Sequence, residues 1–261
     1  MEINMNNAEL IATAFCDEII RTLHGLRFSI YVGGSIALNK HDKFSDIDIC
    51  IIHDGDISIA DIPNAERILK TPQGIQSSVN FKGEKIDLRL DCLKTLTNSV
   101  EDFISRNDLT PRGQLYLSAL KAGRYCKDDL NVKGLTRNLS IDEEARSKVI
   151  EDNCRFIRDY GFLIYLERGD YATLADTLLF TYRAFIHVYY ALDFSLFRGY
   201  KHAAAFETNK NKGGQAVIEA FQSIFMQPEA GKLKTLSRHL NSFFQLHLPQ
   251  LEMNFDFQIG R

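Results

Sequence analysis

The sequence predicts an α+β fold in which an N-terminal domain, a mixed sheet flanked by helices, is followed by a C-terminal helical bundle. In the first half, short β-rich runs that end in glycine turns alternate with helical spacing, whereas helical spacing alone persists from Ile141 onward. The length of 261 residues suffices for two cores. We therefore expect one domain over residues 1–135 and a second over residues 136–261.

The elements of the first domain follow in order. Apolar residues recur at helical spacing over residues 8–26, which predicts an amphipathic helix ending near Gly25. Two strands are predicted at 27–32 and 46–52, the first closed by a Gly-Gly turn, and a short helix at 64–70.

Two further strands are predicted at 74–81 and 85–90, joined by a tight hairpin at Lys82-Gly83-Glu84. The stretch 121–140 is rich in Gly, Asp, Lys and Asn, and it predicts the loop between the domains. Beyond it, helical spacing predicts a bundle of about four helices, at 143–167, 171–192, 213–226 and 231–248. The aromatic residues between Tyr160 and Tyr200 recur at core spacing, which favours a packed core over a stacking platform.

Composition and charge exclude several classes of function. With 45% hydrophobic and 25% charged residues and a formal net charge of -3, the chain has no overall attraction for nucleic acid or membranes. The N-terminus does not resemble a secretory signal, and no apolar run approaches the roughly 18 residues of a membrane span. Five scattered cysteines without CxxC spacing fit reduced thiols. We expect a cytoplasmic protein that does not contact a membrane.

A glycine turn after the first predicted strand carries the first chemical signal. Gly33 and Gly34 let the backbone approach an anion without an intervening side chain, and their N–H groups with the Ser35 hydroxyl form a candidate phosphate cradle. On its own such a tripeptide usually marks a simple turn.

Acidic residues follow on the next strands. Asp46 and Asp48 are two residues apart in an alternating run, so both carboxylates leave the same face of a strand. Mg²⁺ is typically coordinated by one or two protein carboxylates when substrate phosphates supply its other ligands. Asp87 shares a strand face with Arg89 and Asp91, and it is a candidate third carboxylate.

Together, these motifs over roughly residues 8–130 resemble the polymerase-beta-type nucleotidyltransferase superfamily. The resemblance implies transfer of a nucleoside monophosphate from a nucleoside triphosphate to a hydroxyl group, with release of pyrophosphate. The nucleotide would be AMP from ATP, or the monophosphate of another nucleoside triphosphate. It implies two Mg²⁺ ions held by Asp46 and Asp48, with Asp87 ligating the second ion or accepting the proton of the acceptor hydroxyl.

The resemblance also implies nucleotide contacts outside the carboxylates. Ser35 and Ser45 would touch phosphate or nucleotide, Lys43 or Lys40 would neutralise pyrophosphate, and Lys201 would reach the phosphates from the second domain. For Lys40 and Lys43, a solvated loop position is the commoner role of such residues, and for Lys201 the alternative is an exposed cation in a loop between helices.

The order of domains is similar to that of small antibiotic nucleotidyltransferases, which move AMP to an aminoglycoside or lincosamide hydroxyl. It implies a small-molecule acceptor chosen by the second domain, an aminoglycoside-type antibiotic among the candidates, and a role in antibiotic resistance. Two features depart from the aminoglycoside enzymes: Asp87 stands where they have a glutamate, and the chain has no Trp. A toxin-like transferase acting on tRNA or protein and a non-enzymatic nucleotide-binding module stay open. An acidic cleft opposite the three carboxylates would favour a cationic sugar as acceptor, whereas a basic cleft there would favour RNA.

Overall fold

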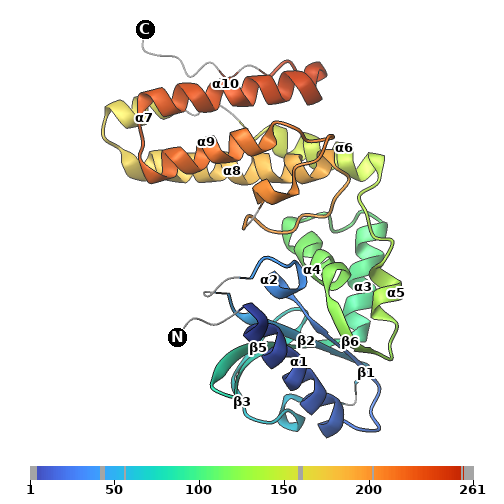
Figure 1. The fold of residues 1–261 in the computed structure, drawn as a ribbon. Coiled ribbons are helices and arrows are strands. Elements are labelled where there is room, and N and C mark those ends of the chain that lie inside the picture. Colours follow the sequence, from blue (N-terminus) through green and yellow to red (C-terminus); the bar gives the residue numbers. More distant parts are fainter. Residues whose placement is uncertain are drawn as a thin grey trace. The chain divides into compact units, whose positions relative to one another are not determined.

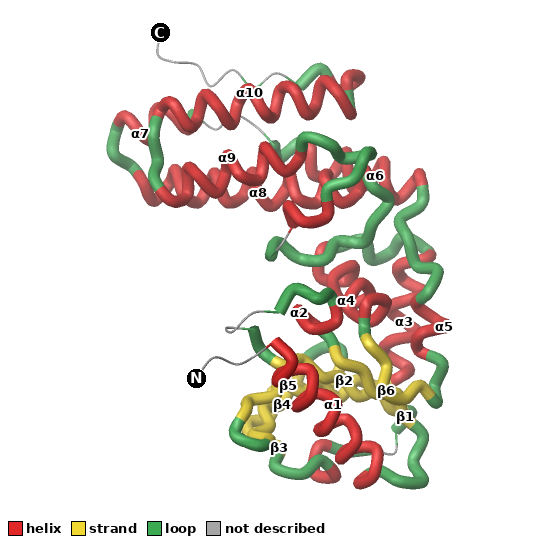
Figure 2. Tube along the Cα trace, in the orientation of Figure 1, coloured by secondary structure: helices red, strands yellow, loops and turns green. Residues whose placement is uncertain are grey.

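The chain forms two compact units. The computed structural model describes residues 5–41, 45–55, 57–157, 161–201, 203–253 and 255. The contacts divide the chain into Met1–Leu139 and Ser140–Arg261, a few residues after the predicted boundary. The first unit contains a sheet with helices and the second contains helices (Figures 1 and 2), so the predicted α+β class is confirmed.

A mixed sheet forms the centre of the first unit. Within the described residues it has six strands in the order β3-β4-β5-β2-β1-β6. β2 and β5 are parallel, and the other neighbouring pairs are antiparallel. The strands are β1 (Phe28–Val32), β2 (Ile47–His53), β3 (Ala65–Lys70), β4 (Gly74–Phe81), β5 (Glu84–Cys92) and β6 (Arg124–Asp128).

Helix α1 (Met5–Thr22) covers one face of this sheet. Its Phe15 and Ile19 pack in one buried cluster with alternate residues of the central strands, among them Ile49 and Leu88. Full burial of such side chains contributes roughly 1.5–3 kcal/mol each. Because strand side chains alternate, the residues between them face the opposite side of the sheet.

The opposite face is covered by helices for which the sequence analysis made no prediction. They are α3 (Leu93–Ile104) and α4 (Pro111–Ala122). Thr110 caps α4 by accepting a hydrogen bond from the Gly113 N–H at 3.2 Å. Pro111 follows at the first helical position, where its missing N–H costs nothing because an N–H at that position has no partner within the helix. The Tyr116 ring lies 5.1 Å from the Arg89 guanidinium, so α4 packs on the polar side of β5.

Two predictions for the first unit are wrong. Residues 65–70 form the edge strand β3 rather than a helix, because antiparallel pairing with β4 on one side of the strand outweighs the helix propensity of Ala, Glu, Arg, Leu and Lys. The stretch 121–140 is not only a loop. It contains β6, which pairs with β1, and the short helix α5 (Val132–Thr136).

The hairpin between β4 and β5 is confirmed. Lys82 and Gly83 have φ values of +53° and +85°, as expected for a type I′ turn of two residues, whose twist matches that of the flanking strands. This turn sets the register that pairs Ser78 with Asp87 and Gln76 with Arg89. It therefore decides which polar side chains of the two strands are neighbours.

The second unit is helical within its described residues. Its helices are α6 (Glu143–Cys154), α7 (Phe162–Glu167), α8 (Tyr171–Leu192), α9 (Gly214–Met226) and α10 (Ala230–His247). The single helix predicted over 143–167 is wrong: α7 begins separately, after Gly161 in the left-handed region at φ +72°.

Aromatic side chains fill the core of this unit, which confirms their interpretation as packing residues. The ring centroid of Phe185 in α8 lies 6.4 Å from that of Phe221 in α9 and 5.0 Å from that of Phe243 in α10. Tyr189 and Tyr190 are also buried. No helix in the described part of the chain has the length and apolar character needed to cross a membrane.

Candidate active site

Two of the predicted carboxylates are neighbours in the sheet. In the parallel pairing of β2 with β5, Asp48 lies opposite Asp87. The residues before them, Ile47 and Ile86, are buried against α1, so both aspartates leave the other face. Adjacent strands are about 4.8 Å apart, which brings the two side chains next to each other at the centre of the sheet.

The glycine turn is built around Asp48. The Gly33 N–H donates to the Asp48 carbonyl oxygen at 2.8 Å. Gly34 has φ +56°, and a Cβ at this position would lie 1.8 Å from Asp48 Oδ2. Only glycine fits this conformation and this approach without strain. Ser35 follows in the four-residue helix α2 (Gly34–Ala37) and is partly buried, so the predicted phosphate cradle directly adjoins one predicted metal ligand.

The other predicted residues are less closely associated. Asp46 is exposed and lies just before β2, next to the partly buried Ser45. Among residues 5–41, 45–55 and the later described ranges, no three His, Cys, Asp or Glu side chains form a group that could hold a metal ion. Lys43 lies outside the described residues, and Lys201 is exposed in the second unit. Their roles stay predictions.

The donor set fits a divalent cation that shares its ligands with phosphates. Asp48 and Asp87 supply hard oxygen atoms from adjacent strands, and Mg²⁺ is usually bound through one or two carboxylates plus substrate phosphates. Lys85 Nζ lies 3.1 Å from Asp87 Oδ1, but the lysine side chain is 66% exposed, so a metal ion competes only with a weak pair. Lys85 was not predicted as a site residue, although its spacing of two from Asp87 places it on the same strand face.

A pocket of about 360 Å³ adjoins Asp48 on the same side of the sheet. It lies between α4 and the side of the sheet formed by β2, β5, β4 and the turn before β4. The described residues that line it are Asp48, Thr71, Gln73, Gln76, Arg89, Arg112, Leu115, Tyr116 and Ala119. The sequence analysis missed this pocket. The alternation that places Arg89 on the same strand face as Asp87 could have indicated the wall formed by β5. The other wall is formed by α4, a helix that the sequence did not predict.

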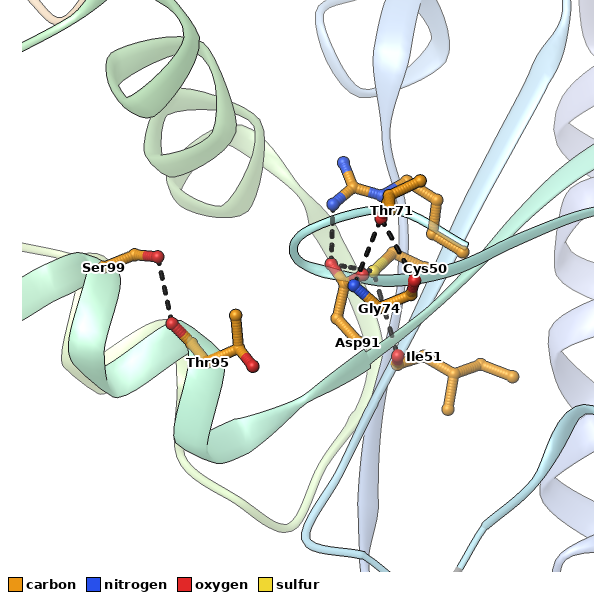
Figure 3. A network of polar contacts seen from close by, with 8 residues as sticks. Cys50, Ile51, Thr71, Gly74, Asp91, Thr95 and Ser99 are labelled. Atoms are coloured by element: carbon orange, nitrogen blue, oxygen red, sulfur yellow. Dashed lines mark hydrogen bonds and ion pairs between the residues drawn. The ribbon is translucent and has the colours of Figure 1, made fainter. Parts of the chain in front are cut away.

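A buried network fixes Arg89 at the pocket. Arg89 Nη2 donates to Asp91 Oδ2 at 2.8 Å, and the Asp91 side chain is fully buried. Cys50 Sγ lies 3.6 Å from the same oxygen (Figure 3). Burial raises the pKa of Asp91, which the Arg89 charge lowers by a smaller amount, and burial together with Asp91 raises the pKa of the Cys50 thiol. Cys50 is therefore a protonated packing residue rather than a nucleophile.

The hairpin before β4 is held close to this network. The Thr71 hydroxyl accepts a hydrogen bond from the Gly74 N–H at 3.1 Å, as Figure 3 shows. A Cβ on Gly74 would lie 2.1 Å from the Leu90 carbonyl oxygen, so the chain can pass this close to β5 only with glycine. The turn thereby places Thr71 and Gln73 at the rim of the pocket.

The family model of the nucleotidyltransferase domain matches residues 16–158, more than half of the chain. The chain belongs to the nucleotidyltransferase domain family. This confirms the resemblance to the polymerase-beta-type superfamily and the assignment as a nucleotidyltransferase enzyme. The matched residues include the glycine turn, the paired aspartates and the whole pocket lining.

A similar solved structure is that of a nucleotidyltransferase-like protein from Exiguobacterium sibiricum. It is 11% identical with a TM-score of 0.40, and the alignment covers 93% of this chain and 78% of that chain. A similarity this distant assigns no role to single residues. No curated protein sequence matches this chain.

Proposed function

We propose that the chain transfers a nucleoside monophosphate, AMP from ATP, to a hydroxyl group of a small molecule and releases pyrophosphate. The observation that carries the proposal is the register of Asp48 against Asp87 beside the turn of Gly33 and Gly34. A site that only senses nucleotides has no need for two adjacent carboxylates next to the phosphate cradle.

The reaction is an in-line displacement at the α-phosphorus. The acceptor oxygen forms a bond to phosphorus while the bond to the bridging oxygen of the β-phosphate breaks, and that electron pair leaves with pyrophosphate. Asp87 accepts the acceptor proton, and the N–H groups of the glycine turn with Ser35 and Ser45 orient the phosphates. Mg²⁺ held by Asp46, Asp48 and Asp87 would neutralise the charge that develops on the phosphate oxygens.

The two units take different parts of this reaction. The first unit, with its sheet site, holds the donor nucleotide and the catalytic carboxylates. For the second unit, a phosphate contact by Lys201 and a part in acceptor selection stay predictions. An aminoglycoside-type acceptor, and with it a role in antibiotic resistance, stays a prediction.

The direct test incubates the full chain with ATP, Mg²⁺ and a panel of hydroxyl compounds, including aminoglycosides and lincosamides, and measures pyrophosphate release and the adenylylated product by mass spectrometry. We expect an acceptor-dependent release that Asp48→Asn abolishes. Asp54→Asn is the matched control, because Asp54 is an exposed aspartate in the turn after β2.

Two results would contradict the proposal. Equal turnover by the wild type and Asp48→Asn would mean that the carboxylate pair is not catalytic. The second is transfer of label from ATP to RNA or protein in a cell lysate and to none of the small acceptors. That result would mean that the acceptor is a polymer rather than a small molecule.

A further inference from the structure

We propose that the pocket beside Asp48 binds an anionic group of the acceptor, so that the acceptor is a small hydroxyl compound carrying a phosphate or a carboxylate. This inference rests on the proposed function and names the substrate class of the same site. It is drawn from the position of two arginines, Arg89 and Arg112, in the pocket wall.

The pocket begins where the reaction would take place. Asp48 lines it, and Arg89 follows Asp87 by two residues on the same face of β5. At about 3.3 Å per residue, the two positions are roughly 7 Å apart along the strand. An acceptor whose anionic group is bound at Arg89 would therefore have its other end close to Asp87.

Arg89 is held in place with part of its guanidinium still available. Asp91 binds one terminal nitrogen, Nη2, at 2.8 Å, and the Tyr116 ring lies 5.1 Å from the guanidinium carbon. Within the described ranges, the Nε and Nη1 groups of Arg89 donate to no protein atom. A guanidinium fixed by a buried carboxylate on one edge can use its other edge for a planar oxyanion such as carboxylate or phosphate.

Arg112 faces the same pocket from α4. It is exposed, and it makes no ion pair or hydrogen bond with any residue in the described parts of the chain. Gln73 and Gln76 add amide groups to the lining. Of the described lining residues, Arg89 and Arg112 carry a positive charge and Asp48 carries a negative one. Because Asp91 already pairs with Arg89, it is Arg112, without an ion-pair partner in the described parts of the chain, that most strongly attracts an anion to the pocket.

This charge distribution separates the acceptor classes. Two arginines repel a polycationic aminoglycoside. Nucleic acid binding uses extended basic surfaces that follow many phosphates, whereas here two cations line a hollow of about 360 Å³, within the range of small-ligand pockets. A small anionic molecule satisfies both the charge and the volume.

The test first fills the donor site of the full chain with a non-hydrolysable ATP analogue and Mg²⁺, and then measures binding by calorimetry. Glycerol 3-phosphate and glycerate are titrated against uncharged glycerol, with the wild type, Arg112→Gln and Arg137→Gln. Arg137 is the matched control, an exposed arginine of the first unit outside the pocket lining. We expect an anion to bind where glycerol does not, and Arg112→Gln to weaken it at least about tenfold while Arg137→Gln has no effect.

The outcomes separate this inference from the function on which it rests. If the wild type fails to bind the ATP analogue, the proposed function itself fails. If the analogue binds but neither anion does, or Arg112→Gln binds the anions as the wild type does, only the anionic acceptor is overturned. Binding of an aminoglycoside, or of an RNA oligonucleotide, that depends on Arg112 when neither anion binds would also overturn it, in favour of a cationic or a polymeric acceptor.

Discussion

The two units of the chain use their polar residues differently. In the first unit, one face of β2 and β5 packs against α1 while the other face carries Asp48, Asp87 and Arg89. In the second unit, more than half of α8 is buried, and its Tyr182, Tyr189 and Tyr190 lie within the core. Because side chains alternate along a strand, every second residue can be polar and reach a site while the others pack in the core. A helix that is surrounded by other helices has fewer positions that can be polar without disturbing the core.

The largest effect that would test this comparison comes from the sheet. Asp87→Asn should lower kcat by about 10²–10⁴, because the amide cannot accept the acceptor proton, while the ATP affinity stays within a few fold. Single-turnover kinetics would measure this. Glu84→Gln, at the hairpin end of the same strand, is the control and should retain turnover. An unchanged kcat with a raised KM for ATP would limit Asp87 to binding.

The glycine turn should show the next largest effect. In Gly34→Ala the new Cβ would meet Asp48 Oδ2 at 1.8 Å and the backbone would keep φ +56°, so we expect about 1–3 kcal/mol less stability and about a hundredfold loss of turnover. Urea unfolding and initial rates would measure both. Gly25→Ala has a similar positive φ, +87°, with nothing within 4 Å, and should lose stability without losing turnover. Equal kinetic losses in both variants would disprove the role of the contact.

A pH experiment examines the second unit. His187 lies between Asn153 Oδ1 at 3.0 Å and the Tyr200 hydroxyl at 3.1 Å, and burial lowers its pKa from 6.5 to about 4. Below pH 6.5 the unfolded chain binds a proton that the folded chain does not bind until about pH 4. The free energy of unfolding should therefore fall by about 3 kcal/mol as the pH drops through this window.

His187→Gln is the test of this linkage, because it removes the titrating group. The difference between the urea stabilities at pH 7 and pH 4.5 should be smaller in this variant than in the wild type. His239→Gln removes a histidine of α10 outside the hydrogen-bond chain and should behave as the wild type does. The same pH dependence in wild type and His187→Gln would show that other groups control acid unfolding of this unit.

The smallest effect concerns the ion pair at the sheet surface. Lys85→Met removes the cation that lies 3.1 Å from Asp87, so Mn²⁺ should bind a few fold more tightly while stability changes by less than about 0.5 kcal/mol. A Mn²⁺ titration followed by electron paramagnetic resonance would measure the affinity. Lys82→Met in the neighbouring turn should leave it unchanged, and weaker metal binding by Lys85→Met would mean that the lysine supports the site.

Local patterns predicted the faces of the strands but not their partners. Alternation placed Asp87 and Arg89 on one face of β5, and the structure confirms this. The pairing of β2 with β5 joins strands distant in sequence, and no local pattern encodes it; only the family resemblance linked Asp48 to Asp87. Arg112 was missed for the same reason, because its place in the pocket depends on where α4 packs. The error at β3 arose where tertiary pairing overrode propensity.

The strand order has a further consequence for hydrogen exchange. β2 and β5 each have a paired strand on both sides, whereas β3 and β6 are the edges of the described sheet. Opening a central strand breaks two ladders, so the amides of β2 and β5 should exchange late and those of β3 and β6 early. Asp48 and Asp87, the proposed catalytic carboxylates, thus stand on the backbone expected to open last, and transient fraying at either edge should leave their spacing intact.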